Sequence, residues 1–425
     1  MNNTTLPHQW RRVALGDVLE EKLDRSWPGA ELLSVTNDRG VILQSESAKR
    51  DTSSVDKSKY KRVCPNDIVY NTMRMWQGVS ARSSYEGIVS PAYTVCRPTS
   101  EVDPRYIAAL LKHPDLVIQF HRFAQGLVDD TLNLKYQAFA KISAILPPLP
   151  EQRRIADILD TVDAAIQQTE ALIAKLKLMK AGLLHDLLTR GLDEQGNLRD
   201  PIAHPEQFKD SPLGRIPRGW EVSTLAKLIL GKISNGFFKK PELVGSGYPL
   251  VNVLDLYQDF GIDLNSVERV RASKQEQHRY AIRPGDCFFT RSSLNLSGIA
   301  HCNVIRDVPE PALYECHLMR IRPDQEQIIP EFFAHWCRSP WARKFFIQRA
   351  KQVTMTTISQ PDIAPLPVPL PSKTEQKTIV EMLDAHDARI RTEEAYCDKL
   401  KQLKQGLMRD LLTGRVRVRA EKEVR

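Results

Sequence analysis

The sequence predicts an α+β protein: two globular domains of mixed α/β structure, separated by two long antiparallel coiled-coil helices. Three observations predict it. A long segment of helical periodicity occurs twice, each copy begins after a proline-rich stretch, and the residues before the two copies share a fainter pattern. The predicted divisions are residues 1–150, 151–192, 193–365 and 366–425, the last of which includes a basic C-terminal tail.

The long repeat is the strongest of these observations. With Glu151 aligned to Glu375, the two copies stay in register without a gap and end in "GLLHDLLTRG" and "GLMRDLLTGR". Chance does not produce such agreement along a whole helix. Identical pairs include Ile155/Ile379, Leu159/Leu383, Asp163/Asp387, Ile166/Ile390, Lys180/Lys404 and Asp186/Asp410.

Within each copy, apolar residues recur in alternating steps of four and three, which is the heptad pattern of a left-handed coiled coil. Lys180 and Lys404 occupy one equivalent position of this seam and are expected to set its register. The second copy has a more polar middle, at His386, Glu393 and Cys397. The predicted seam residues are Ile155, Leu159, Val162, Ile166, Ile173, Leu176, Leu183 and Leu187, followed by Ile379, Leu383, Ile390, Leu400, Leu407 and Leu411.

The starts of the helices and the order of the chain complete the predicted frame. The stretches "ILPPLP" and "PLPVPLPSKT" precede Glu151 and Glu375, and prolines cannot continue a helix backward. An antiparallel pair of such helices, each roughly 55 Å long, would have a pseudo-twofold axis. The alternative, two amphipathic helices in unrelated cores, does not explain the shared register.

The globular segments repeat more faintly. Trp10 in "LPHQWRRVAL" matches Trp220 in "IPRGWEVSTL", and "CPNDIVYNTMR" resembles "RPGDCFFTRSS". The segments "DPRYIAALLKHP" and "IPEFFAHWCRSP" each predict a short helix before a proline. Two equivalent frames with different surfaces indicate two related tasks on two different targets.

Composition limits the class of protein. Apolar residues make up 42% and charged residues 26%, as in ordinary globular proteins, and no apolar run is long enough to span a membrane. Seven scattered cysteines without a C-x-x-C motif, and the lack of an export signal at the N-terminus, predict a cytoplasmic protein with reduced thiols. The net charge of +8 favours a polyanionic partner.

These motifs carry a resemblance to a known family. The segments "LPPLPEQRRIADILD", "GLLHDLLTRG" and "DSPLGRIPRGWEV", with their second copies, resemble the specificity subunit of type I restriction-modification systems along the whole chain. "NDIVYNTMRMWQGV" with "GIVSPAYTV" also resembles one class of target-recognition domain in that family.

The resemblance implies two target-recognition domains, each binding one half of a split site in double-stranded DNA. It further implies that the helices act as a spacer and dock two methyltransferase subunits, and that the chain itself is not catalytic. The partner subunits, including two restriction or translocase subunits, are expected to use S-adenosylmethionine, and ATP with Mg²⁺.

Enzyme and metal interpretations find little support in the residues. A methyltransferase cofactor loop, an N-P-P-[FY] motif and a P-loop are missing. A nuclease-like pattern, Asp362 followed by Glu375 and Lys377, is interrupted by a proline-rich connector. For the neighbouring pairs His301–Cys302 and Cys316–His317, packed thiols are expected rather than zinc ligands. We therefore predict no catalytic residue, no metal and no cofactor in this chain.

Candidate DNA contacts come from side chains suited to phosphates and base edges. The alternative for each lysine cluster is a solvated surface, and Trp76 could equally belong to the core. The candidates are Lys57, Lys59, Lys61, Arg62, Arg74, Trp76 and Gln77 in the first domain, and Asn235, Lys239, Lys240, Arg291, Asn295, Lys351, Gln352 and Thr354 in the second.

Two other functions stay open at this point. A subunit of a related methylation or restriction assembly would have nearly the same sequence. A coiled-coil scaffold with two protein-binding heads would not bind duplex DNA in the salt-sensitive, sequence-selective manner expected of the other two.

Overall fold

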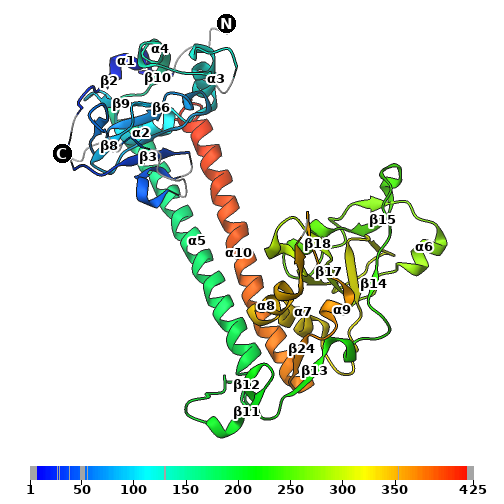
Figure 1. The fold of residues 1–425 in the computed structure, drawn as a ribbon. Coiled ribbons are helices and arrows are strands. Elements are labelled where there is room, and N and C mark those ends of the chain that lie inside the picture. Colours follow the sequence, from blue (N-terminus) through cyan, green and yellow to red (C-terminus); the bar gives the residue numbers. More distant parts are fainter. Residues whose placement is uncertain are drawn as a thin grey trace. The chain divides into compact units, whose positions relative to one another are not determined.

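The computed structural model describes residues 7–25, 27, 29–37, 39–47, 53–54, 56–128, 131–352 and 354–418 (Figure 1). The last residues of the predicted basic tail, 419–425, lie outside this range. The chain forms two compact units: unit 1 consists of residues 1–170 and 395–425, and unit 2 of residues 171–394. The two long helices, α5 (Leu149–Thr189) and α10 (Lys373–Leu411), each contribute to both units. The four-part division made from the sequence stays a prediction.

Unit 1 contains a four-stranded antiparallel sheet in the order β2-β9-β6-β7. A separate antiparallel pair, β1 with β10, leads directly into α5. The strands are β1 (Arg11–Ala14), β2 (Leu19–Glu21), β3 (Leu33–Thr36), β4 (Gly40–Leu43), β5 (Lys61–Val63), β6 (Ile68–Asn71), β7 (Ser80–Arg82), β8 (Gly87–Val89), β9 (Tyr93–Pro98) and β10 (Ser143–Leu146). The helices are α1 (Leu15–Val18), α2 (Pro104–Leu110), α3 (Pro114–Phe123) and α4 (Tyr136–Phe139), with short 3-10 turns η1 (Gln44–Glu46) and η2 (Met75–Gln77).

Unit 2 repeats this plan. Its four-stranded sheet has the order β14-β21-β17-β19, and an antiparallel pair, β13 with β24, leads into α10. The strands are β11 (Phe208–Ser211), β12 (Gly214–Pro217), β13 (Glu221–Thr224), β14 (Ser234–Asn235), β15 (Val244–Val251), β16 (Arg269–Val270), β17 (Cys287–Thr290), β18 (Ser292–Ser293), β19 (Cys302–Val304), β20 (Leu313–Tyr314), β21 (Leu318–Ile321), β22 (Lys351–Gln352), β23 (Thr356–Thr357) and β24 (Pro367–Leu370). The helices are α6 (Lys274–Arg279), α7 (Pro330–Arg338), α8 (Pro340–Arg349) and α9 (Gln360–Ile363).

The central strands β6 and β17 explain where each core lies. Both are apolar runs, and because each pairs with a strand on either side, nearly all of their side chains are buried. Short helices cover each sheet and begin at a proline, which is tolerated in the first turn. The side chains of Asp103 and Ser339 cap two of these helices by accepting hydrogen bonds from their first backbone N–H groups.

Two glutamines join the start of each long helix to its α/β domain. Gln152 accepts a hydrogen bond from the backbone N–H of Asp103 (2.9 Å), and its amide donates to the carbonyl of Pro147 (2.9 Å). Gln376 likewise accepts from Ile329 N (2.8 Å) and donates to the carbonyl of Pro371 (3.0 Å). Because both side chains are buried, each must satisfy its polar atoms inside the protein, which explains why the repeat keeps this residue.

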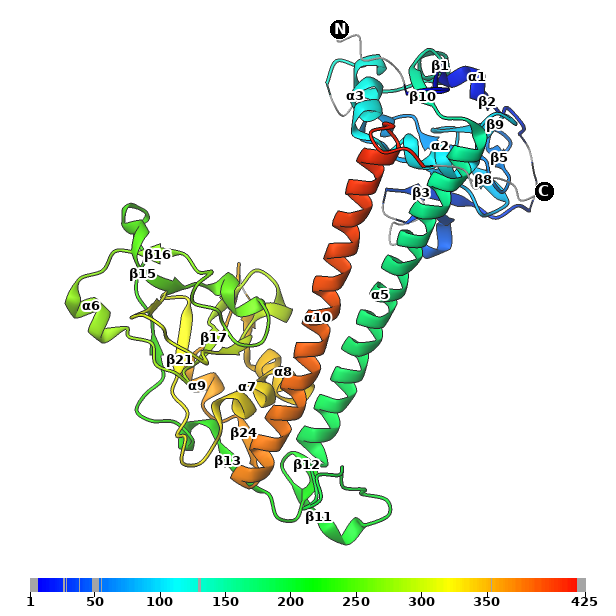
Figure 2. The same ribbon diagram turned by 180° about the vertical axis from the view of Figure 1, so that it is seen from behind.

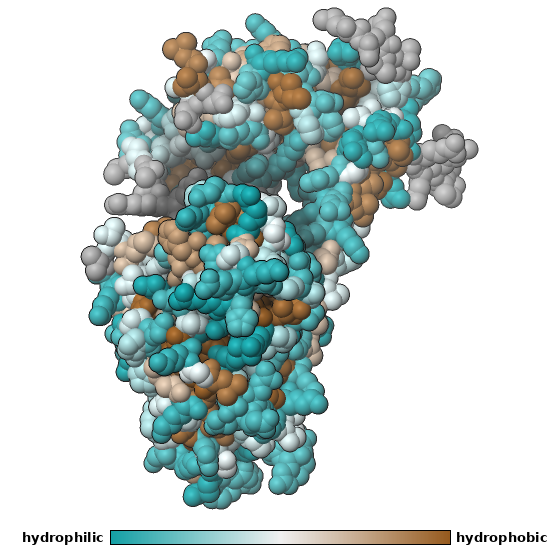
Figure 3. Space-filling model, turned by 90° about the vertical axis from the view of Figure 1, so that its right-hand side faces the viewer, coloured by the Kyte–Doolittle hydropathy of each residue, from teal (hydrophilic) through white to brown (hydrophobic). Residues whose placement is uncertain are grey.

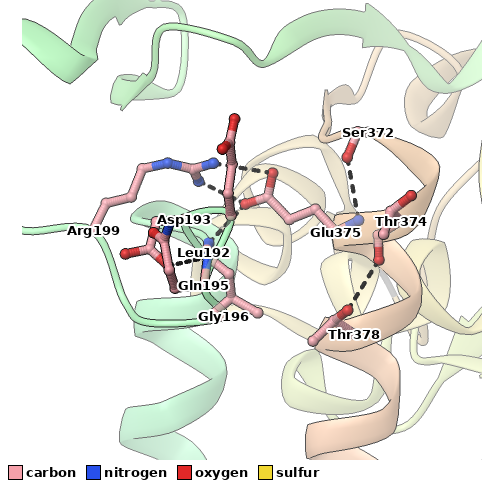
Figure 4. A pocket seen from close by; sticks show the side chains of 10 residues that line it. Leu192, Asp193, Gln195, Gly196, Arg199, Ser372, Thr374, Glu375 and Thr378 are labelled. Atoms are coloured by element: carbon pink, nitrogen blue, oxygen red, sulfur yellow. Dashed lines mark hydrogen bonds and ion pairs between the residues drawn. The ribbon is translucent and has the colours of Figure 1, made fainter.

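The neighbouring glutamates form what we call the carboxylate clamps. In unit 2, Glu375 accepts a hydrogen bond from Trp220 Nε1 (3.0 Å). It also accepts one from Leu192 N (2.7 Å) and pairs with Arg199 (2.6 Å), as Figure 4 shows. Arg199 follows α5, and Glu375 lies in the first turn of α10. Gly191 has a left-handed backbone (φ 62°), and a Cβ there would lie 2.3 Å from a carboxylate oxygen of Glu375, so only glycine fits.

Unit 1 contains the matching clamp. Glu151, in the first turn of α5, accepts from Trp10 Nε1 (3.1 Å) and forms two hydrogen bonds of 2.8 Å with Arg417, which follows α10. In both units, therefore, the glutamate that opens one long helix binds a tryptophan of the α/β domain and an arginine that follows the other helix.

Ion pairs also connect the long helices within each unit. In unit 1, Lys404 pairs with Asp163 (2.6 Å) and Lys401 with Glu170 (2.8 Å). In unit 2, Lys180 pairs with Asp387, and Lys177 with Glu394. The residue numbers of the paired side chains rise along α5 as they fall along α10, so the paired stretches run antiparallel in each unit, as Figure 2 shows.

The predicted seam residues are all buried or half-buried. Their knobs-into-holes register stays a prediction. In the described part of the chain, no helix is long and apolar enough to cross a membrane. On the face drawn in Figure 3, hydrophilic residues cover most of the surface, and hydrophobic ones are scattered among them.

Candidate nucleic-acid interface

In unit 2, two of the three predicted DNA-contact segments come together. Strand β18, just after central strand β17, pairs with β23, which in turn pairs with β22. The backbone of Arg291 accepts a hydrogen bond from Ile358 N (3.0 Å) and donates to the carbonyl of His317 (2.9 Å). The predicted residues on these segments are all exposed; they are Arg291, Asn295, Lys351, Gln352 and Thr354.

The loop after β17, residues 291–300, is held by bonds to its carbonyl groups. The carbonyl of Gly298 accepts from both Thr290 Oγ1 (2.7 Å) and Tyr257 OH (2.8 Å). The guanidinium of Arg343 donates to the carbonyls of Ala300 (2.8 Å) and Ser297 (2.9 Å). Since its backbone is bonded along its length, this loop presents its exposed side chains from a defined position.

The third predicted segment of unit 2, residues 235–240, divides into two parts. Asn235 is half-buried, and its side chain accepts a hydrogen bond from Gln360 (3.3 Å). Lys239 pairs with Glu268 (2.7 Å), whereas Lys240 is exposed. Asn235 and Lys239 therefore already have partners in the protein, and Lys240 is the more accessible cation of this segment.

In unit 1, the predicted segment "RMWQG" forms the loop after central strand β6. Arg74 and Gln77 are exposed on either side of Met75, which is buried. Trp76 is half-buried; its Nε1 donates to the carbonyl of Met73 (3.1 Å), and its ring meets that of His121 edge-on. The segment is a compact turn in which Arg74 and Gln77 are the exposed polar groups.

The basic stretch of unit 1 is only partly suited to phosphate binding. The Lys61 side chain is buried, with 9% of the residue exposed, and its ammonium donates to the carbonyl of Tyr93 (2.8 Å). Arg62 lies over the ring of Trp27 and pairs with Glu86 (2.7 Å). Burial argues against the prediction for Lys61, because a phosphate contact needs an accessible ammonium. Of the other lysines in this stretch, Lys59 is exposed and Lys57 half-buried.

Sequence reasoning missed one segment of unit 1. Gln125 and Asn133 pair through two backbone hydrogen bonds of 3.0 and 2.9 Å, and Leu127 between them is 100% exposed. Leu134 N donates to the carbonyl of Thr72 (2.8 Å), just as Ile358 N does to Arg291 in unit 2. This segment follows α3 as β22 and β23 follow α8, so extending the faint repeat past Pro114 and Pro340 would have found it.

The residues of the nuclease-like pattern do not form a site. The carboxylate of Asp362 accepts a hydrogen bond from Ser359 N (2.9 Å) at the start of α9. Glu375 belongs to the carboxylate clamp, and Lys377 lies near Glu381 (3.8 Å) on the same helix. Each of these groups thus has a structural partner of its own.

Comparison with known proteins decides the family. The model of the type I restriction modification DNA specificity domain matches residues 7–178 and again residues 217–402. The chain belongs to this specificity family. The two matches cover the two halves of the internal repeat, each with an α/β domain and most of one long helix. Recognition of a DNA sequence for a type I restriction-modification system is therefore its function.

Specificity subunits of other organisms are similar in sequence to this chain along most of its length. It is 23% identical over 429 residues to the type I restriction enzyme MjaVIII specificity subunit of Methanocaldococcus jannaschii, covering 99% of this chain and 96% of that one. It is 27% identical to the EcoKI specificity subunit of Escherichia coli, covering 76% and 68%.

Solved structures share the fold. The type I restriction-modification S subunit from M. genitalium has a TM-score of 0.57 at 13% identity and covers 97% of both chains. A structure described as showing complex assembly and conformational transition of the type I restriction-modification system has a TM-score of 0.56 at 18% identity, covering 97% of this chain and 100% of that one.

Proposed function

We propose that each α/β domain is a target-recognition domain and reads one half of a split target in duplex DNA. It would do so through the loop after its central strand, β6 or β17, and through the segment that follows α3 in unit 1 or α8 in unit 2. The observation that carries the proposal is the repeated framework of these two segments. In both units the same backbone hydrogen bonds hold them, through Thr72 in unit 1 and Arg291 in unit 2, while the exposed side chains differ.

The side chains at these segments suit the two kinds of DNA contact. Arg74 and Arg291 can each form a bidentate pair of hydrogen bonds with the edge of a guanine, and Gln352 can form such a pair with an adenine. Lys240 and Lys351 suit phosphate oxygens, which position a protein without reading sequence. Different side chains on one framework favour two different half-sites.

We further propose that the long helices form an antiparallel coiled coil with a pseudo-twofold axis and set the gap between the half-sites. The tryptophan–glutamate bonds of the two carboxylate clamps and the ion pairs Lys404–Asp163 and Lys180–Asp387 support this frame, because equivalent residues make equivalent contacts in each unit. A reader with a twofold frame engages two half-sites separated by helical turns of DNA.

The same helices would dock two methyltransferase subunits. Met179 and Leu403 occupy equivalent positions of the repeat and are 49% and 51% exposed. Together with Leu178 (76% exposed) and Tyr396 (51% exposed) on the same helices, these exposed apolar side chains favour a protein partner. The methyltransferases would supply S-adenosylmethionine chemistry, and two restriction subunits would use ATP with Mg²⁺. This chain would contribute recognition alone.

The test is methylome sequencing of cells that carry this chain with its methyltransferase partner. Exchange of residues 124–134 for those of a relative is expected to change one half of the methylated motif, and exchange of residues 350–358 the other half. Arg291→Ala is expected to relax one position at a cost of about 1–3 kcal/mol. Lys274→Ala, an exposed lysine on α6, is the matched control and should leave the motif unchanged. If either exchange altered both halves or neither, the proposal would be wrong.

A further inference from the structure

A turn between β20 and β21 gathers three different donor groups. The N–H of Leu318 donates to the carbonyl of Glu315 (3.1 Å), which closes the turn. Successive side chains of an extended strand point to opposite faces, but a turn can bring them together. Here the carboxylate of Glu315, the thiol of Cys316 and the imidazole of His317 each offer one donor atom, and these atoms all lie within 4.8 Å of one another.

The carboxylate of Glu315 forms no salt bridge in the described part of the chain, although Lys239 and His317 lie near enough to attract it. Only 7% of the residue is exposed, and its polar contacts are the thiol of Cys316 (3.8 Å) and the backbone N–H of His317. Lys239 pairs instead with Glu268 (2.7 Å). Because Lys239 is already paired with Glu268, a cation bound beside Glu315 would supply the counter-charge that a buried carboxylate needs.

In contrast to the expectation from the sequence that this chain holds no metal, we propose that Glu315, Cys316 and His317 bind a Zn²⁺ ion. A mixed set of oxygen, sulfur and nitrogen donors suits zinc, whereas Ca²⁺ and Mg²⁺ take oxygen donors. On binding, the thiol releases its proton to solvent and the thiolate sulfur donates an electron pair to the metal. Three protein ligands leave a fourth tetrahedral position to water. The other adjacent histidine–cysteine pair, His301 and Cys302, is not part of this group of donor atoms.

The site would strengthen the candidate DNA interface of unit 2. His317 Nδ1 lies 3.1 Å from Ser292 Oγ, and the carbonyl of His317 accepts from Arg291 N (2.9 Å). Hydrogen bonds to a ligating histidine orient its ring for the metal. The ion would thus connect the turn to the loop that carries Arg291.

Unit 1 provides an internal comparison. Its matching turn runs from Ser90 to Tyr93, where Tyr93 N donates to the carbonyl of Ser90 (3.0 Å) and Thr72 N to that of Ala92 (3.0 Å). Ser90, Pro91 and Ala92 stand where unit 2 has Glu315, Cys316 and His317, so this turn lacks the donor set. The ion is therefore expected to bind in unit 2 alone.

The experiment measures metal binding by the full chain without DNA, so its result is independent of the proposed target recognition. The metal-free chain is titrated with Zn²⁺ against a chromogenic chelator, and with Co²⁺ to detect a sulfur-to-cobalt charge-transfer band. We expect one ion per chain. Cys316→Ser should abolish the band, while Cys64→Ser, which alters the other half-buried thiol, should keep it.

His317→Ala provides a second variant whose side chain is exposed, so folding should be unaffected and circular dichroism can verify this. Loss of a hydrogen bond to a ligating side chain costs roughly 10–100-fold in metal affinity, and loss of a ligand should cost at least as much. Absence of stoichiometric uptake by the folded chain, or equal affinity in the parent and both site variants, would overturn the proposal.

Discussion

Replacement of Glu375 by alanine tests the carboxylate clamp of unit 2. The change removes the acceptor for two buried N–H groups, those of Trp220 and Leu192, and the partner of Arg199. A buried donor left without a partner costs about 1–3 kcal/mol. Two such donors give a loss of about 2–6 kcal/mol in the free energy of unfolding, while Arg199 regains contact with water.

Glu375→Gln separates the effect of charge from that of shape. Glutamine keeps the volume and one acceptor oxygen but replaces charged hydrogen bonds, worth about 1.5–3 kcal/mol, with neutral ones of about 0.5–1.5 kcal/mol. We therefore expect a smaller loss than for alanine. Glu151→Ala should produce the matching loss in unit 1, where Trp10 and Arg417 lose the same acceptor.

The assay is urea denaturation combined with hydrogen exchange of the segments around residues 190–220 and 373–383, which assigns the loss to unit 2. Glu381→Ala is the matched control on the same helix, because Glu381 is exposed and lies 3.8 Å from Lys377. Exposed ion pairs of this kind contribute about 0–1 kcal/mol. Equal unfolding free energies for Glu375→Ala and Glu381→Ala would refute the reasoning.

Three further predictions concern pH, ion pairing and helix length. Burial lowers the pKa of His335 well below its ordinary value and lowers the pKa of His301 to about 4. Below about pH 6.5 the unfolded chain therefore binds more protons than the folded chain. Unit 2 should lose stability as the pH falls from about 6.5 toward 4. A urea midpoint that does not fall over this range would contradict the prediction. Asp163→Lys and Lys404→Asp should each lower the free energy of unfolding of unit 1, and the double variant should recover part of this loss. Losses that simply add in the double variant would argue against the ion pair. Insertion of seven residues into each long helix, between Asp163 and Lys180 and between Asp387 and Lys404, lengthens each helix by about 10 Å. The gap between the half-sites should then grow by up to three base pairs, at about 3.4 Å each. An unchanged gap in an active complex would exclude the spacer role.

The sequence by itself determined the parts of this protein that repeat. Heptad spacing and proline stops predict the two long helices, because helix formation depends on residues three and four apart. The equivalence of Trp10 and Trp220 was also visible, although not their partners. Glu151 and Glu375 were recognised as aligned residues, but the arginines that complete the clamps, Arg199 and Arg417, do not align with each other.

The candidate interface could be predicted only in part. The side-chain chemistry of Arg291 and Lys351 predicts DNA contacts, and the structure brings their segments together through β18, β22 and β23. The chemistry of Lys61 predicts a DNA contact in the same way, yet its ammonium is buried against the carbonyl of Tyr93. Local sequence shows which groups a side chain carries, but not whether distant residues cover it.

Only the tertiary structure decided which distant segments share a surface. The segment from Gln125 to Asn133 has no basic residue, and it became a candidate because Leu134 bonds to Thr72 across the domain. Glu315, Cys316 and His317 are adjacent in the chain, but an extended strand would point them apart. The physical reason is common to both cases: backbone hydrogen bonds between residues far apart, or within a turn, set the direction of each side chain, and these bonds form only when the whole domain folds.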